Sequence, residues 1–385
     1  MNGDFDDTMR DNTIDAFFAL VRAGLFPVHG EGVMVHDSLF KDVNWNEVYQ
    51  MAQEQSVQGL LLQGIETVQG SWFKVHSSPL VPKVLLLHWI GEVQIIEQRN
   101  KAMNQLIADL VAKMREADIY TLLVKGQGIA QCYEKPQWRT SGDIDFFLSD
   151  TNYEKAKSFL KPLANDGKPE RLYSKEIGFY VNSWLIELHG TLHTGLSTRV
   201  DKSIDAVQRD VFYAGNVRSW YNGNTQVFLP AADEDVFLVF THFVKHFYKE
   251  GGVTVRQMCD WCRLLYRYRG ELDLRILESR IKRAGLLSEW KAFGALAVEY
   301  LGMPIEAMPL LDVRSEKEDG RCEIDTELRM KAEKIVAFIL KGGKWQRFKD
   351  TFRVGSIFPL NTLRFLPGII LGVNWLKIKE RIFKR

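Results

Sequence analysis

The chain has 385 residues, of which 46% are hydrophobic and 26% are charged, and its formal net charge is +1. This balance is typical of an ordinary soluble globular protein, and the length allows two or three domains. The near-zero charge gives the whole molecule no bias toward nucleic acid, and the four cysteines are too few for a disulfide-stabilised scaffold.

Nothing in the sequence indicates secretion or a membrane-spanning helix. The first ten residues, MNGDFDDTMR, are acidic and polar, unlike a secretory signal. The best apolar run, FLPGIILGVNWL at 365–376, is shorter than the roughly 20 residues that a membrane helix needs and contains Pro367 and Gly368. Together with the low cysteine count, these features predict a cytoplasmic protein without a transmembrane segment.

Residues 1–115 are predicted to form an N-terminal helical region. The segment 44–68 has apolar residues at helical spacing. The segment 84–117 has the same pattern, and it is long enough for a pair of helices or for one extended helix.

The pattern changes over residues 116–230, where short apolar runs alternate with helical segments and predict an α/β core. Strands are expected at 119–126, 143–148, 177–182, 184–190 and 225–230. The third and fourth of these form an antiparallel pair that turns near Asn182 and Ser183, and the fifth is an edge strand closed by Pro230. Short helices are expected at 127–136 and 151–166.

From residue 231 onward the sequence is helical again, with a C-terminal helical region at 231–310 and a helical, basic extension at 311–385. Helices are predicted at 231–250, 254–268, 273–284, 286–301 and 324–341. Cys259 and Cys262 lie one helical turn apart in this region. We interpret them as core residues, because a lone C-x-x-C lacks the second pair that a structural zinc site needs.

Two aspartates interrupt the apolar strand RTSGDIDFFL at 139–148. Side chains alternate along a strand, so Asp143 and Asp145 share one face, with Cα atoms about 6.5–7 Å apart. Either this is a surface strand whose outer face happens to be acidic, or the charges hold a cation, for which Mg²⁺ is the usual choice. Gly142 removes a side chain just before the pair, which lets a ligand or backbone approach. Without metal the two charges repel, so Asp145→Asn is expected to match or exceed the thermal stability of the wild type.

A third carboxylate lies in the strand WLIELHG at 184–190, where Glu187 and His189 share one face. If this strand neighbours the Asp143 strand, Glu187 supplies a third ligand, as two-metal phosphoryl-transfer sites require. His189 orients Glu187, touches substrate, or is a hydrogen-bonded structural histidine.

The segment LLVKGQG at 122–128 predicts a strand that turns at Gly126 into a helix. Backbone N–H groups at such a junction bind phosphate, assisted by the helix dipole. Lys125 and Arg139 are then candidates for neutralising phosphate charge, the alternative being that each is a solvated residue at the end of an element.

Taken together, these motifs resemble the nucleotidyltransferase superfamily that includes DNA polymerase β, and most closely its large family of poorly characterised bacterial nucleotidyltransferases. The resemblance covers roughly 40–310. The matching positions are Lys125, Gly126, Arg139, Gly142, Asp143, Asp145, Glu187 and His189, followed by His242, His246 and Asp260 in the helical segment. The resemblance implies an α/β (α+β) fold with a polymerase β-like core and a mixed sheet, flanked by helical regions.

The resemblance also implies an activity, namely transfer of an NMP from an NTP to an acceptor hydroxyl with release of pyrophosphate. Asp143, Asp145 and Glu187 would be the catalytic and metal-binding residues for Mg²⁺ or Mn²⁺, with the third carboxylate as the base. Lys125, Gly126, Gln127, Arg139, Gly142, His189 and His246 would bind the nucleotide. The family's turn is usually G-S or G-G, whereas this chain has Gly126-Gln127, and its third carboxylate is commonly aspartate.

Two other functions stay open at this point. The chain could be a non-catalytic protein that keeps the fold to bind a nucleotide or a partner, which the Gln127 departure favours. It could also be an enzyme that modifies a protein side chain. His242 and His246 lie four residues apart on a helix and could bind a metal together, but the zinc-protease pattern is absent beside them. We therefore expect them to line the helical side of the nucleotide cleft or to pack in it.

The C-terminal extension has its own signature. Residues 341–385 contain eleven Lys or Arg and two Asp or Glu, an excess of +9 that leaves −8 for residues 1–340. Aromatic residues are interleaved with these charges. Such a segment either contacts an anionic membrane surface or a nucleic-acid backbone, or packs as a basic helical extension on the acidic remainder of the chain.

Overall fold

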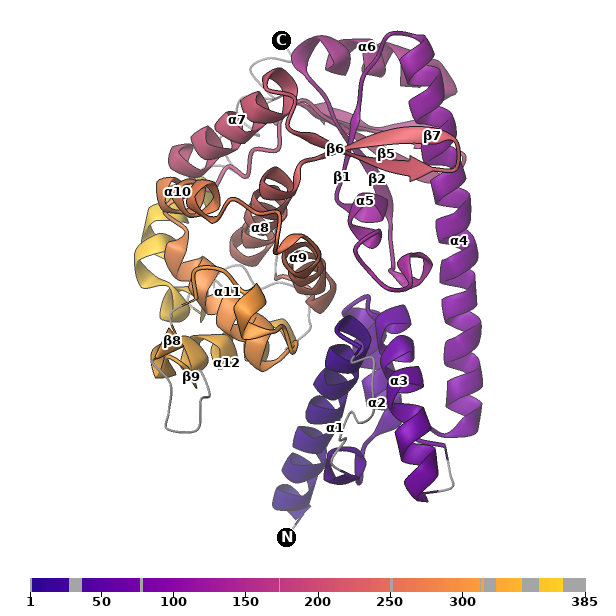
Figure 1. Cartoon of the computed structure of the whole chain (residues 1–385), viewed down its shortest axis with the longest axis vertical. Coiled ribbons are helices and arrows are strands. Elements are labelled where there is room, and N and C mark those ends of the chain that lie inside the picture. Colours follow the sequence, from indigo (N-terminus) through magenta and orange to yellow (C-terminus); the bar gives the residue numbers. More distant parts are fainter. Residues whose placement is uncertain are drawn as a thin grey trace.

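The computed structural model describes residues 2–27, 37–76, 79–172, 174–249, 252–311, 313–314, 323–340 and 353–369. The architecture is a mixed α/β fold with helices on both sides of one large sheet, as the sequence predicts (Figure 1).

The N-terminal region is helical, as predicted, with α1 at Asn2–Leu25, α2 at Trp45–Glu54 and α3 at Gln58–His76. The segment 44–68 contains two helices, because the backbone of Ser56 takes a positive φ of 57° between α2 and α3.

Helices α1 and α3 approach each other closely at Gly24. A Cβ at Gly24 would lie 2.2 Å from the carbonyl oxygen of Leu60, so a larger residue there would push the helices apart.

Helix α4 resolves the choice left open for 84–117. It runs unbroken from Lys83 to Glu116, 34 residues in all. Figure 1 shows it spanning the molecule from the N-terminal helices to the sheet. Its C-terminal half packs against the sheet through Met103, Ile107 and Met114, so one rigid element connects the two regions.

The sheet has seven strands in the order β3-β4-β5-β2-β1-β7-β6. In chain order they are β1 Leu122–Val124, β2 Asp143–Phe147, β3 Asp166–Arg171, β4 Glu176–Val181, β5 Trp184–His189, β6 Val217–Asn222 and β7 Thr225–Pro230. Strand β2 lies parallel to β5 and antiparallel to β1. The predicted β4–β5 hairpin is present, with Asn182 and Ser183 at positive φ in its turn.

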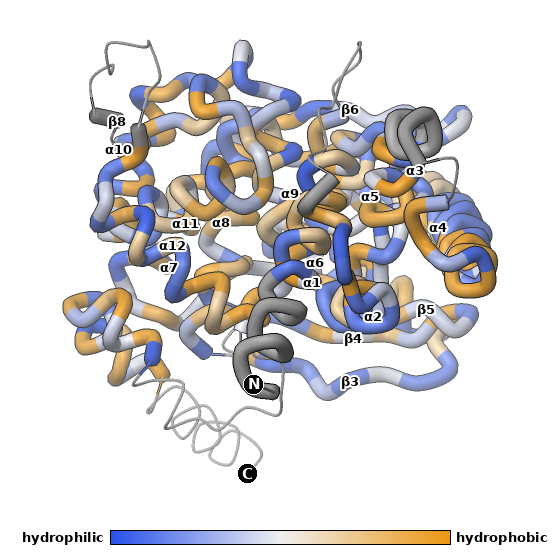
Figure 2. The backbone as a smooth tube through the Cα atoms, turned by 90° about the horizontal axis from the view of Figure 1, so that it is seen from below, coloured by the Kyte–Doolittle hydropathy of each residue, from blue (hydrophilic) through white to orange (hydrophobic). Residues whose placement is uncertain are grey.

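The prediction that 225–230 is an edge strand is wrong. Strand β7 lies between β1 and β6, and the edges are β3 and β6. These two strands escape sequence analysis because they are largely solvent-exposed and lack an apolar pattern. Figure 2 shows β3 in hydrophilic colours. Helix α7 at Thr198–Tyr213 is likewise absent from the sequence prediction.

One face of the central strands is apolar and one carries the polar groups. Ile144 and Phe146 pack in a cluster with α4 and with α6, which spans Asp150–Leu160 and is preceded by the β2 strand. Side chains at alternate positions must then point to the opposite face. Asp143 and Asp145 therefore face away from α4, toward the C-terminal helices.

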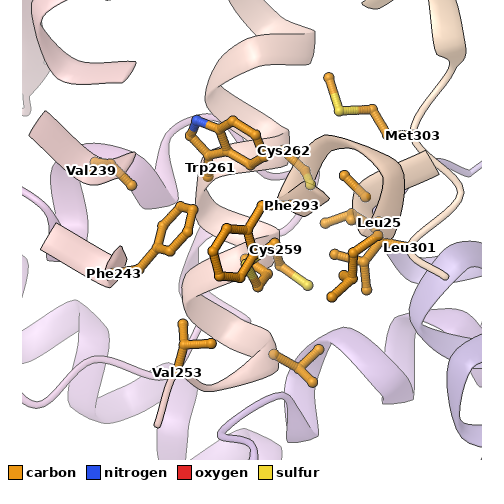
Figure 3. Packing of buried hydrophobic residues seen from close by; sticks show 14 of the residues in the cluster. Leu25, Val239, Phe243, Val253, Cys259, Trp261, Cys262, Phe293, Leu301 and Met303 are labelled. Carbon is orange, nitrogen blue, oxygen red and sulfur yellow. The ribbon is translucent and has the colours of Figure 1, made fainter. Parts of the chain in front are cut away.

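The C-terminal helices are α8 Ala232–Lys249, α9 Val255–Tyr268, α10 Leu274–Ala284, α11 Leu287–Glu299 and α12 Thr326–Leu340, each close to its predicted range. The short helix predicted at 127–136 is α5 at Gly126–Ala130. Cys259 and Cys262 are fully buried free thiols that pack beside Phe293, which confirms them as core residues (Figure 3).

The described part of the C-terminal extension packs on these helices. Residues 353–357 and 359–369 are helical, and Phe358 and Phe365 are buried against Tyr248. This supports the packing interpretation for these residues. The predicted membrane contact depends on 341–352 and 370–385, which lie outside the described residues. No helix in the described ranges is both long and apolar enough to span a membrane.

A buried polar contact fixes this extension, and it yields a prediction. The side-chain amide of Asn361 donates to both oxygens of the fully buried Glu289, at 2.6 and 2.8 Å. Asn361→Ala is expected to lower the free energy of unfolding by roughly 1.5–3 kcal/mol, because a buried carboxylate loses a donor. Urea denaturation measures the loss. Leu360→Ala, at a side chain that is 79% exposed, is the control and should change stability by less than about 0.5 kcal/mol. Equal stability of Asn361→Ala and wild type would contradict the role of this contact.

Candidate active site

A cavity of about 380 Å³ lies between the polar face of the sheet and helices α8 and α9. This size is within the range of small-molecule sites. Among the predicted site residues, the structure places Lys125, Gly126, Arg139, Gly142, Asp143, Asp145, Glu187, His189 and His246 on its wall. Gln127 does not line it. One cavity therefore gathers residues that are more than a hundred positions apart in the sequence.

The parallel pairing of β2 with β5 brings the carboxylates together. Asp145 stands directly opposite Glu187 in the register of the two strands. One ligand atom each from Asp145, Glu187 and His189 lie within 4.8 Å of one another. Two ligands of one Mg²⁺ ion are at most about 4.2 Å apart, so only a small closure would let the two carboxylates share an ion. The oxygen-rich donor set therefore fits a divalent cation.

Asp143 and His189 have different places in this arrangement. Asp143 lines the same cavity but is not a member of the three-residue group. His189 Nε2 lies 2.7 Å from Asp145 Oδ1 and 3.9 Å from Glu187 Oε2. The histidine thus orients Asp145 rather than Glu187.

Each of the two paired carboxylates also contacts a lysine. Lys125 Nζ donates to Asp145 Oδ1 at 3.1 Å, and Lys168 Nζ donates to Glu187 Oε1 at 2.8 Å. The expectation that the Asp145 charge is only repelled in the absence of metal is therefore wrong, because Asp145 is buried and has both a lysine and a histidine as partners. Lys168 was not predicted, because it lies on β3, which has no apolar pattern.

The two aspartates consequently differ in acidity. Burial raises the pKa of Asp145, but Lys125 and His189 lower it by more, so its net pKa is well below the ordinary value. Asp145 and burial together raise the pKa of Asp143, and Lys125 only partly offsets them. The ionised form is thus favoured at Asp145 and disfavoured at Asp143.

The predicted turn from strand to helix at Gly126 is present between β1 and α5. Lys125 and Gly126 both have positive φ values, 58° and 39°. The side chain of Gln127 points behind this turn, where it is 1% exposed and donates to Asn100 Oδ1 at 2.9 Å and Ser141 Oγ at 3.1 Å. Gln127 thus ties the turn to α4 and to the segment before β2. The Gln127 side chain therefore holds neighbouring segments of the site together, and it does not line the cavity.

Arg139 is similarly engaged by the protein. Its Nε and Nη2 donate to the two oxygens of Asp260 at 2.7 and 2.6 Å, and its Nη1 donates to Ser141 Oγ at 2.7 Å. Tyr133 donates to the same Asp260 at 2.8 Å. The Arg139 side chain is 3% exposed, so this bidentate pair mainly fastens α9 to the entrance of β2.

The helical wall carries the histidines and further cations. His242 Nε2 and His246 Nε2 lie 2.9 Å apart, and burial together with Lys125 and His246 holds the pKa of His242 well below its ordinary value. Lys245 and Arg256 line the cavity beside them, and neither was predicted. No sequence motif identifies Arg256, which lies in the first turn of α9 within the capping box of Thr254 and Gln257.

Comparison with known proteins gives one match. A family model described as uncharacterised nucleotidyltransferase matches residues 41–302, which include the sheet, the cavity and the helices α8 to α11. No curated protein and no solved structure matches the chain.

Proposed function

The chain belongs to the uncharacterised nucleotidyltransferase family, and we propose that it transfers an NMP from an NTP to an acceptor hydroxyl with release of pyrophosphate. The observation that carries this proposal is the convergence of Asp145, Glu187 and His189, from two strands, beside Asp143 in one cavity.

Asp145 and Glu187 are the residues that would hold a divalent cation, Mg²⁺ or Mn²⁺, with Asp143 beside them. When bound, the cation would neutralise charge on the phosphates and favour in-line displacement at the α-phosphorus. His189 keeps Asp145 oriented through its 2.7 Å contact. Lys125 contacts Asp145 and lines the cavity, and in this proposal it would neutralise phosphate charge.

In the proposed reaction the acceptor oxygen forms a bond to the α-phosphorus while the bond from that phosphorus to the β-bridging oxygen breaks. Pyrophosphate leaves with the bonding electrons. The proton of the acceptor hydroxyl passes to Glu187 Oε2, because Oε1 is held by Lys168.

A second candidate function is nucleotide or partner binding without catalysis. The lysine partners of Asp145 and Glu187 favour it, because they already neutralise both carboxylates. The test is a screen of the four NTPs with Mg²⁺ or Mn²⁺ that follows pyrophosphate release against small-molecule, sugar and protein acceptors. Release that depends on one acceptor supports transfer. Nucleotide binding without release against every acceptor supports the binding function.

Glu187→Gln tests the proposed base. It keeps the shape of the side chain and removes its charge, so we expect transfer at saturating Mg²⁺–NTP to slow by roughly 10²-fold. Rapid-quench assays of single-turnover transfer measure the effect. Glu176→Gln is the matched control, since Glu176 also lines the cavity but pairs with Arg171 at 2.9 Å. Unchanged transfer in Glu187→Gln would remove Glu187 from the mechanism.

A further inference from the structure

We propose that Arg256 binds the terminal phosphates of the nucleotide, the role that sequence analysis gave to Arg139. This inference rests on the proposed function for its ligand class, a polyphosphate complexed with a divalent cation. It concerns a residue that neither the sequence motifs nor the resemblance singled out.

Arg256 is a guanidinium on the cavity wall with unused hydrogen-bonding capacity. It lies in the first turn of α9, and its side chain is 28% exposed. Within the part of the chain that the structure describes, its buried Nε has no hydrogen-bond partner. The carboxylate oxygen nearest in an ion pair, Asp260 Oδ2, lies 3.8 Å from Nη1, which is beyond hydrogen-bonding distance.

Asp260 makes an ion pair with Arg256 at 3.8 Å but no hydrogen bond to it, and its oxygens accept hydrogen bonds from other donors. Oδ1 accepts from Tyr133 and from Arg139, and Oδ2 accepts from Arg139. The bidentate geometry and near-complete burial of Arg139 also mean that this residue could reach a phosphate only by breaking its pair. Arg256 can contact a ligand without breaking a hydrogen bond among the described residues.

Two other cations of the cavity wall each have a carboxylate partner. Lys125 pairs with Asp145 at 3.1 Å, and Arg171 pairs with Glu176 at 2.9 Å. Arg256 instead stands in an environment that disfavours its charge, since burial and the neighbouring Arg139 lower its pKa. An anion beside it would relieve both effects.

The charge pattern of the cavity matches one kind of ligand. Asp143, a carboxylate, and Arg256, a guanidinium, line the same cavity. A divalent cation bound to a polyphosphate presents the two complementary charges together. The planar guanidinium can donate two N–H groups to one phosphate.

Isothermal titration calorimetry with Mg²⁺–tripolyphosphate and with Mg²⁺–ATP tests the inference without any acceptor or turnover. We expect Arg256→Met to weaken both ligands by about 10- to 100-fold, the usual range for a lost charged hydrogen bond. Arg256→Lys should recover part of this loss. Arg267→Met, which removes the same charge near the other end of α9, should bind both ligands as the wild type does.

Thermal denaturation separates this role from a structural one. Arg256→Met should melt at the wild-type temperature or above it, because the protein alone disfavours the charge of Arg256. A variant that melts lower yet binds tripolyphosphate normally would overturn the inference, as would a wild type that binds Mg²⁺–ATP but not Mg²⁺–tripolyphosphate. If no acceptor supports transfer while Arg256→Met still loses tripolyphosphate, the proposed function fails and the phosphate site stands.

Discussion

Asp145→Asn is expected to slow nucleotide transfer by roughly 10³-fold or more and also to destabilise the protein in the absence of metal. The kinetic loss follows because cation stabilisation of phosphoryl transfer contributes several kcal/mol. The loss of stability follows because Asp145 is buried and accepts from Lys125 and His189. Leaving such donors unpaired costs roughly 1–3 kcal/mol.

Asp143→Asn is the matched comparison, because it removes the same charge from the same face of β2. In the wild type, Asp145 and burial raise the pKa of Asp143, so the ionised Asp143 carboxylate costs the folded protein free energy at neutral pH. We therefore expect Asp143→Asn to equal or exceed the metal-free stability of the wild type. The gain that sequence analysis expected from Asp145→Asn should appear at Asp143 instead.

The pH dependence of these two effects has opposite signs. The folded pKa of Asp145 is lowered, so its contribution to stability is present above the ordinary pKa of aspartate, about 4, and is lost as the pH falls below it. The folded pKa of Asp143 is raised, so its cost is present at neutral pH and disappears as the carboxyl protonates. Urea denaturation at pH 7 and at pH 4 should show the Asp143→Asn difference shrinking, whereas the Asp145→Asn difference should shrink only as the pH falls below about 4.

Ligand-induced stabilisation gives the second readout of Asp145→Asn. With Mg²⁺ and NTP at about a hundredfold excess over Kd, the wild type should gain about 2.7 kcal/mol by mass action. The variant should lose most of this gain. A variant that kept the whole Mg²⁺–NTP shift would falsify the assignment of Asp145 to the metal site.

Asp260→Asn is expected to lower the free energy of unfolding by about 3–5 kcal/mol. The reason is that Arg139, whose side chain is 3% exposed, would keep its charge without a carboxylate. Burial lowers the pKa of Arg139 but Asp260 raises it by more, which shows how strongly the guanidinium depends on this partner. Differential scanning calorimetry and urea denaturation measure the loss.

The double variant Arg139→Met/Asp260→Leu separates a lost interaction from an uncompensated charge. Replacing both members of a buried pair by apolar residues of similar volume is often neutral, so the double variant should regain most of the stability. Tyr133→Phe removes only a neutral donor to Asp260 and should cost about 1 kcal/mol. If Asp260→Asn were as mild as Tyr133→Phe, the pair would not be what fastens α9 to the entrance of β2.

Sequence analysis succeeded where local pattern and strand alternation decide the structure. The β4–β5 hairpin was predicted by two apolar runs with Asn182 and Ser183 between them. It failed at β3 and β6, because exposed edge strands bury too little apolar surface to leave a period-2 pattern. It also missed α7, although Val200, Ile204, Val207 and Val211 repeat there at helical spacing and are buried. The failure at β3 hid Lys168, the partner of Glu187, since that strand carries it.

By itself the sequence determined that Asp143 and Asp145 lie on one face of their strand and that Glu187 and His189 lie on one face of theirs. It also determined that Lys125 and Gly126 form a turn. Each of these follows from backbone periodicity within one element. Only the tertiary structure decided how the charges are paired, because a partner such as Lys125, Lys168 or Asp260 is chosen by strand order and helix packing. Because of this pairing, Arg139 connects α9 to the segment before β2, whereas Arg256 lines the cavity. The same pairing shifts the pKa values of Asp143 and Asp145 in opposite directions.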